Sequence, residues 1–146
     1  MPRRSSPLEA TLLLCDHAEA VGGKLYINGG GWNVLLRPGV PVNLSLAILI
    51  EVPWDAANAQ HRLRAYLLTE DGEPVATPNG EPLEVDGGFE VGRPPGVKPG
   101  STLNTPLVIN FNALSLDAGG YEWRLEVDDA LVARKPFRVA AGAPPS

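Results

Sequence analysis

Cys15, Asp16 and His17 are consecutive and offer a thiol, a carboxylate and an imidazole, the groups that a nucleophilic catalyst combines. In a strand, Cys15 and His17 would share one face and Asp16 would point away, so the triplet alone cannot form a nucleophile, a base and an orienting group. Neither His61 nor Glu19 adds the paired-cysteine or His-x-x-x-His spacing of a zinc site. We predict no metal ligands and no cofactor, and expect Cys15 to be a small buried hydrophobic residue.

A run of three glycines, Gly29, Gly30 and Gly31, could bring backbone N–H groups close to an anion. It lacks the Lys-Ser/Thr pair of a P-loop, the glycine spacing of a dinucleotide-binding motif and a following helix. We therefore interpret the run as structural, a bulge or a close backbone approach beside Trp32.

Carboxylates gather at Glu70, Asp71 and Glu73 and superficially resemble a calcium loop. Only one short segment supplies them, and the ligand pattern of an EF-hand is missing. A solvated turn is predicted, because the pair Asp71-Gly72 is typical of turns in which both central residues need positive φ.

The three tryptophans could stack on a sugar or anchor a protein interface. Trp123 alternates in register with Tyr121 and is predicted to lie in the core. Trp54 follows a proline in a connector that reads as exposed, and His61 is near it in the sequence. Our candidate interface residues are Trp54, His61 and Trp32, with packing over a sheet end as the alternative for Trp54 and a solvated strand position as the alternative for His61.

The elements that would position these residues read as β-strands. Three segments alternate apolar and polar residues with the two-residue period of a half-buried strand, namely Val42–Val52, Leu107–Ala113 and Tyr121–Val127. Weaker strands are predicted at Leu8–Asp16, Lys24–Asn28, Leu63–Thr69 and Val132–Val139. Pro136, within the last of these, suits a sheet edge better than a sheet centre.

Turn residues separate the predicted strands. Gly22-Gly23 and Asp128-Asp129 are each predicted to close a hairpin. The segment Trp54–Gln60 could form a connector helix of about two turns at most. Thr77–Thr102 is rich in proline and glycine and is predicted to be a long loop, with room for one short strand at Phe89–Val91.

This pattern favours an all-β fold of about seven to nine strands, an antiparallel β-sandwich with a barrel as the alternative. The segment Leu116–Tyr121 leading into a strand resembles the tyrosine corner of immunoglobulin-like domains. Trp123 occupies the position of the second cysteine of an antibody domain. The resemblance is therefore to the broad immunoglobulin-like or fibronectin-like class, held together by apolar packing.

A longer order of motifs is similar to an uncharacterised bacterial family known as a domain of unknown function. It comprises Asp16 and the segment Val21–Trp32 with its Gly-Lys-Leu-Tyr-Ile-x-Gly-Gly-Gly-Trp stretch, then Val52–Trp54, His61, Leu67, Asp71-Gly72 and Gly119–Tyr121. The similarity covers about Leu8 to Val139. It implies a small intracellular bacterial β-domain and supplies no activity, substrate or catalytic residue.

Length and charge limit the remaining possibilities. The 146 residues suit one domain, predicted at 8–139, with disordered tails at 1–7 and 140–146. The net charge of −5 disfavours nucleic-acid binding. The single cysteine excludes an internal disulfide, and neither a signal peptide nor a membrane segment is visible, so we expect a cytoplasmic protein.

The function expected from these features is binding rather than catalysis. No catalytic set is readable, so we predict a non-catalytic module that binds itself or an unidentified protein partner. The alternative is a small-molecule or carbohydrate-binding domain that uses Trp54 and the 77–102 loop. An enzyme would need residues gathered from several loops and ranks third.

Overall fold

The structure is a computed structural model, and it describes residues 8–36 and 38–141. The predicted N-terminal tail at 1–7 and most of the predicted C-terminal tail, 142–146, lie outside the described residues. In chain order the strands are β1 (Glu9–Val21), β2 (Lys24–Gly30), β3 (Val34–Leu35), β4 (Val42–Val52), β5 (Gln60–Thr69), β6 (Glu84–Glu90), β7 (Leu103–Leu114), β8 (Gly119–Val127) and β9 (Ala130–Val139).

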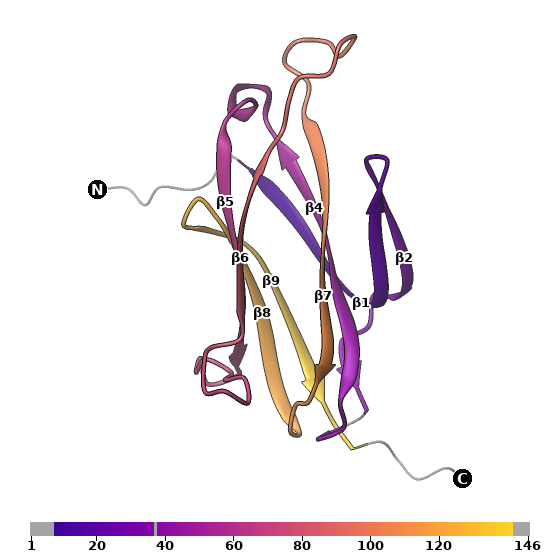
Figure 1. Cartoon of the computed structure of the whole chain (residues 1–146), viewed down its shortest axis with the longest axis vertical. Helices are drawn as coiled ribbons and strands as arrows, with labels where there is room; N and C mark the ends of the chain where they lie inside the picture. The colour runs from indigo at the N-terminus through magenta and orange to yellow at the C-terminus, as the bar shows by residue number, and fades with distance from the viewer. Residues whose placement is uncertain (1–7, 37, 142–146) are drawn as a thin grey trace.

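These strands form two sheets that face each other (Figure 1), so the all-β prediction is confirmed. One sheet has the order β2-β1-β4-β7 and the other β3-β9-β8-β5-β6. The prediction of a purely antiparallel fold is wrong at one place, because β3 pairs with β9 in parallel through Val34 with Arg138 and Leu35 with Val139. The chain reaches β3 after leaving the other sheet, so no hairpin turn forces β3 to run against its neighbour.

The core lies between the sheets and follows the predicted alternation. On β4, Leu46, Ile48 and Ile50 are fully buried, and on β8 so are Trp123 and Leu125. Successive side chains of a strand point to opposite faces, so every second residue of these strands enters the core. The intervening residues of β8 line the outer face of the five-stranded sheet and are only partly buried.

Two of the predicted hairpin turns close as expected. Gly22 and Gly23 have φ of 59° and 75° between β1 and β2, and Asp128 and Asp129 have φ of 51° and 66° between β8 and β9. The turn at Asp71 differs from the prediction, because only Gly72 has positive φ there. The N–H of Gly72 donates to the carbonyl of Thr69 at 2.9 Å, which is a four-residue turn in which the glycine takes the last position.

Two connections depart from the predictions. The expected helix at Trp54–Gln60 is a single 3-10 turn, η1 (Trp54–Ala56), because β5 begins at Gln60. The expected short strand at Phe89–Val91 lies earlier and is longer: β6 (Glu84–Glu90) pairs with β5 through seven residues. Gly87 and Gly88 are accommodated there because β6 is an edge strand, where a weaker ladder is tolerated.

The hairpin of β1 and β2 adds a small second cluster on the other side of the four-stranded sheet. Cys15 and Ala18 of β1 and Ala47 of β4 are buried there, with Leu25 of β2 packed against them. A Cβ on Gly30 would collide with Ile27, so this position needs a glycine for close approach. No helix in the described part of the chain is long and apolar enough to cross a membrane.

Candidate interaction site

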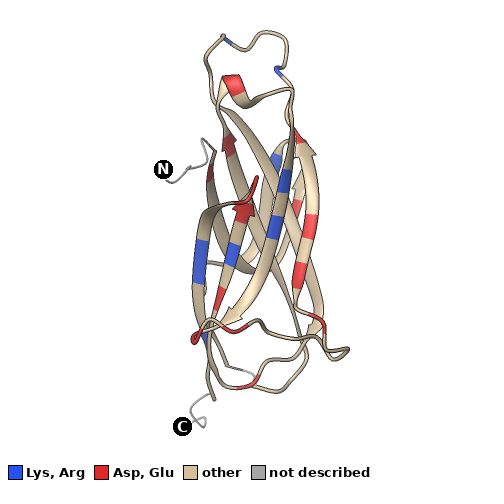
Figure 2. Ribbon diagram, turned by 90° about the vertical axis from the view of Figure 1, so that its left-hand side faces the viewer, with Lys and Arg blue, Asp and Glu red and all other residues tan. Residues whose placement is uncertain are grey.

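A hollow of about 560 Å³ lies on the outer face of the five-stranded sheet. Figure 2 looks onto this face, where strands that carry basic residues lie beside strands that carry acidic ones. The hollow, which we call the arginine groove, is formed by β8, β9, the segment at β3 and the turn after β5. Its charged lining residues are Glu70, Glu122, Arg124, Arg134 and Arg138.

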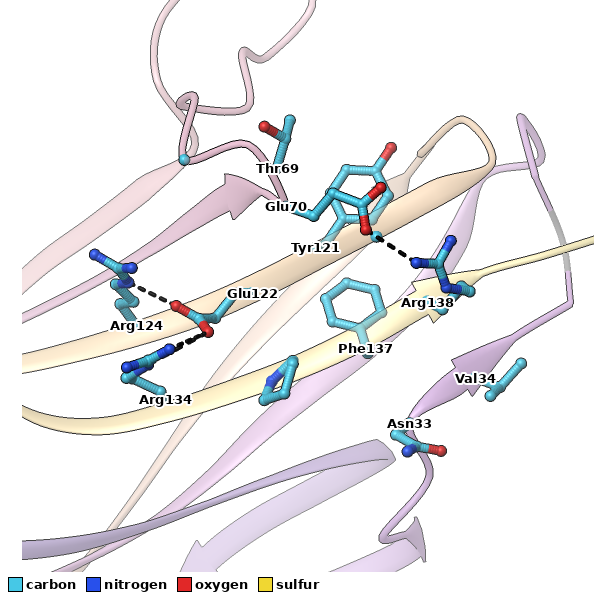
Figure 3. A pocket seen from close by; sticks show the side chains of 13 residues that line it. Asn33, Val34, Thr69, Glu70, Tyr121, Glu122, Arg124, Arg134, Phe137 and Arg138 are labelled. Atoms are coloured by element: carbon cyan, nitrogen blue, oxygen red, sulfur yellow. Dashed lines mark hydrogen bonds and ion pairs between the residues drawn. The ribbon is translucent and has the colours of Figure 1, made fainter.

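Strand alternation and pairing register bring one half of this set together. Glu122 and Arg124 are outward-facing neighbours on β8, and Arg134 of β9 is the direct cross-strand partner of Arg124. Two like charges opposite each other destabilise a sheet, and Glu122 offsets this by bridging them. The Nε of Arg124 donates to Glu122 at 2.7 Å and an Nη of Arg134 donates to it at 3.1 Å (Figure 3). The hydrogen bond from Arg124, with that from Arg134, lowers the pKa of Glu122 despite its partial burial.

A second ion pair closes the other end of the arginine groove. An Nη of Arg138 donates to Glu70 at 2.9 Å, and both side chains are more than half exposed. The backbone N–H of Glu70 donates to the carbonyl of Gly120, and a Cβ at position 120 would collide with the Glu70 carboxylate. Gly120 therefore lets the turn after β5 approach β8. Exposed ion pairs of this kind contribute about 0 to 1 kcal/mol, so a partner can replace them at little cost.

Beneath the arginine groove, on the core side of β8 and β9, lie the rings of Tyr121 and Phe137, of which Phe137 is only 4% exposed. Tyr121 and Phe137 stack with centroids 5.6 Å apart and an interplanar angle of 24° (Figure 3). The Tyr121 hydroxyl donates to the carbonyl of Asp117 at 2.8 Å, which is the hydrogen bond predicted for a tyrosine corner. Burial of the ring, together with the charge of Asp117, raises the pKa of Tyr121. The phenol is thus a fixed hydrogen-bond donor within the fold.

The arginine groove is suited to anionic groups. Its three arginines and two glutamates leave one positive charge in excess, whereas the whole chain carries −5. A guanidinium has five N–H donors, and within the described residues Arg138 uses only one Nη in hydrogen bonding. The unused donors can bind a carboxylate in the two-pronged geometry that arginine favours.

Trp54, the first candidate interface residue, is partly buried at the end of the sandwich opposite the arginine groove. The guanidinium of Arg93 stacks on its ring, 4.5 Å from the centroid, and donates to its carbonyl at 2.7 Å. One face of the indole is therefore covered from within the chain. The ring also packs against the hydrophobic core.

His61, the second candidate, is 7% exposed and has partners at both ring nitrogens. Its Nδ1 lies 2.6 Å from the Asp128 carboxylate and its Nε2 lies 2.8 Å from the carbonyl of Ala56. The ring also stacks on Phe89 at 5.2 Å. The imidazole therefore has an internal role, because it connects β5, η1 and the turn between β8 and β9.

Trp32, the third candidate, is partly buried with its edge toward Phe137, 6.3 Å between centroids. Its buried Nε1 has no hydrogen-bond partner among the described residues. The structure thus does not bring Trp32, Trp54 and His61 together as one exposed surface. An interface role for them stays a prediction.

The residues that we predicted to be structural are buried or lie at close contacts within the chain. Trp123 is fully buried, with its ring 4.8 Å from that of Phe111. Gly29 and Gly31 have φ of 61° and 91°, and a Cβ on Gly29 would collide with Asp16. The N–H of Gly31 donates to the carbonyl of Leu14 at 2.8 Å, so the glycine run ends in a close backbone approach.

The side chains of Cys15 and His17 do not come together, because the first is buried and the second is exposed. Cys15 is fully buried, and burial, together with the nearby charge of Asp16, raises the pKa of its thiol, which disfavours the reactive thiolate. His17 is exposed and lies 3.3 Å from Glu19. Across residues 8–36 and 38–141, no three His, Cys, Asp or Glu side chains converge as a metal site would require.

Sequence reasoning missed the arginine groove. The sequence predicts that Glu122 and Arg124 lie on the solvated face of a strand, but the pairing of β8 with β9 is what brings Arg134 to them. Arg134 and Arg138 occupy alternate positions on either side of Pro136, which is a signal in the sequence for a basic strand face. The sequence predicts a solvated turn at Glu70, whose contact with Arg138 spans 68 positions.

The chain matches a family described as "Family of unknown function (DUF6941)" over residues 10–140. No curated protein matches the chain.

Proposed function

From the premise that this chain belongs to the DUF6941 family of unknown function, matched over residues 10–140, we propose that it is a non-catalytic, immunoglobulin-like protein-binding module. The surface proposed to bind is the arginine groove. Its partner is a protein segment that carries carboxylates. We further propose that the module is bacterial and acts in the cytoplasm, since its one cysteine supplies no internal disulfide.

The strand order supports the immunoglobulin-like class. In such domains strand B lies beside E in one sheet, and C, F and G lie together in the other. Here β4 lies beside β7, and β9-β8-β5 run in the order G-F-C with β6 beyond them. The hydrogen bond from Tyr121 near the start of β8 agrees with this assignment. The buried ring of Trp123 takes the place of the missing cysteine pair.

The observation that carries the binding proposal is the clustering of three arginines in one groove on an open sheet face. Arginine is enriched in protein interfaces. The two ion pairs already there are partly exposed, so a partner's carboxylates can compete for the guanidinium groups. Electrostatic attraction then contributes to association, and high salt weakens it.

A protein partner is favoured over a small molecule by the nature of the lining. Small-molecule sites are mostly apolar and enclosed, whereas the charged side chains here lie on an open surface. Sugar binding by Trp54 would have to use the ring face that Arg93 leaves uncovered.

The test compares three tagged full-length proteins in crosslinking and affinity purification from host cytosol, followed by calorimetry with the purified partner. They are wild type, the groove variant Arg134→Gln/Arg138→Gln, and the control Arg62→Gln/Arg64→Gln, which removes the same charge from the same sheet face outside the groove. We expect one stoichiometric partner for wild type and control, and about tenfold or weaker binding for the groove variant. Equal binding by all three proteins, or no partner for wild type, would overturn the proposal.

A further inference from the structure

β7 (Leu103–Leu114) is a long edge strand that lacks a neighbour on one side. It pairs with β4 through the length of the strand, and its second edge has no backbone partner among the described residues. Pro106 has no N–H, and Ala113 has a positive φ of 55°. Between Pro106 and the register shift at Asn112, Leu107–Phe111 is a regular segment of typical strand length whose outward N–H and C=O groups are unpaired.

The side chains of this segment are incompletely buried on the core side. Leu107 and Ile109 are the cross-strand partners of Ile48 and Leu46, which are fully buried. Leu107 and Ile109 therefore face the core too, yet both are only partly buried. These two side chains are left uncovered on the side of β7 that has no neighbouring strand.

The facing sheet extends beyond β7 at this edge. β1 packs against β9 across the core, so the two strand orders set β7 opposite β5 and leave β6 with no strand opposite it. Val85 of β6 is only partly buried and Gly87 is exposed, although their partners Ala65 and Leu63 are buried. The four-stranded sheet is thus one strand short over β6. Figure 1 shows the 91–102 loop joining β6 to β7 at one end of this edge.

Shape and charge at this edge distinguish between a second copy of the chain and a single added strand as the partner of β7. β7 contains no Asp, Glu, Lys or Arg, whereas β6 contains Glu84, Asp86 and Glu90 and no basic residue. If two copies of the chain joined β7 to β7, each protruding β6 would enter the space of the other copy. A single added strand avoids this conflict, and a basic residue at its end would meet Glu90, which lines a hollow together with Thr105 and Pro106 of β7.

We propose that β7 is a strand-addition site, at which an extended segment of a partner protein with alternating apolar residues and a basic end pairs with Leu107–Phe111. The added strand completes the backbone ladder of β7 and covers Leu107, Ile109 and Val85. This site uses the sheet opposite the arginine groove and does not depend on the function proposed for that groove.

The test uses a capped peptide, Lys-Val-Thr-Val-Thr-Val-Lys, added to the ¹⁵N-labelled full chain. We expect chemical-shift changes and slower amide exchange confined to β7 and β6. The same peptide with proline in place of its central valine should bind about tenfold more weakly, because it cannot complete the ladder. Absence of binding, equal binding of the two peptides, or shifts elsewhere would overturn the proposal.

A variant pair locates the site. Leu107→Lys introduces a charge on the core side of the free edge, a known way of blocking strand addition, and should weaken peptide binding about tenfold. Leu131→Lys makes the same change at a half-exposed leucine of β9 and should bind as wild type does. Peptide binding by Arg134→Gln/Arg138→Gln should also be unchanged. A concentration-dependent dimer in light scattering that Leu107→Lys abolishes would assign the edge to a second copy and overturn the proposal.

Discussion

The Nδ1 of His61 lies 2.6 Å from the Asp128 carboxylate, and this contact joins the start of β5 to the turn between β8 and β9. The Nε2 of the same ring lies 2.8 Å from the carbonyl of Ala56. A carboxylate and a carbonyl both accept hydrogen bonds, so these two contacts favour the imidazolium form of the ring, in which both nitrogens donate. Burial lowers the pKa of His61, but the bonds to Asp128 and Ala56 and the charge of Asp128 outweigh it, and the pKa is raised.

This pair predicts how stability depends on pH. The raised pKa of His61 gives stabilisation that is present below about pH 6.5 and is lost as pH rises through the folded value. Although burial opposes it, the bonds from His61 and from the Arg62 N–H lower the pKa of Asp128, so its contribution is lost as pH falls below about 4. We expect wild type to be most stable between these limits in urea unfolding, and His61→Gln to lose the decline toward pH 8.

An NMR titration of the His61 ring provides the direct readout, with a midpoint expected above about 6.5. A midpoint below that value, or the same decline toward pH 8 in His61→Gln, would contradict the imidazolium assignment.

The close approach of Gly120 to Glu70 predicts a coupled pair of substitutions. Gly120→Ala should lower the free energy of unfolding by up to about 1 kcal/mol, because its methyl group would displace the Glu70 carboxylate, which is the end of a flexible and exposed side chain. Glu70→Ala removes the obstacle, so the double variant Gly120→Ala/Glu70→Ala should recover most of this loss. A double-mutant cycle in urea measures the coupling. Additive effects would show that the collision is not the cause.

The tyrosine corner predicts a smaller effect. Tyr121→Phe removes the hydrogen bond to the Asp117 carbonyl and keeps the stacking on Phe137. We expect a loss of about 1 kcal/mol in unfolding free energy, with no change in the slope against urea. Tyr66→Phe provides a comparison, because it removes the same hydroxyl group from a tyrosine on the outer face, where the hydroxyl donates a hydrogen bond to Glu126. An unchanged stability of Tyr121→Phe would mean that the bond makes no net contribution.

The strands and turns that depend only on neighbouring residues could be predicted from the local periodicity of the sequence. The alternation of Val42–Val52 is β4 itself, with matching ends, and Tyr121 forms the hydrogen bond that its position predicted. These features need only strand geometry and a turn. Gly22-Gly23 and Asp128-Asp129 close hairpins for the same reason.

What could not be predicted depends on pairing between distant segments. β6 contains two glycines that argue against a strand, and only its place at a sheet edge makes it acceptable. Arg124 faces Arg134 through a β8–β9 register that shifts between Leu125 and Glu126, and such a shift leaves no trace in either strand alone. The sequence predicts an interface or solvated position for His61, which is buried in the structure because it contacts Asp128, 67 positions away.

Glu122 offers the sharpest test of the arginine groove, since it is the carboxylate between Arg124 and Arg134. Glu122→Gln leaves two cross-strand guanidinium groups without a bridging charge, so we expect a loss of up to about 1 kcal/mol in unfolding free energy. The same change frees both arginines for an incoming carboxylate and should strengthen partner binding while Arg134→Gln/Arg138→Gln weakens it. Unfolding and calorimetry at low and high salt check both effects, and each should shrink as salt screens the charges. Stabilisation by Glu122→Gln would contradict the bridging role of this carboxylate, and weaker partner binding would mean that the carboxylate itself contacts the partner.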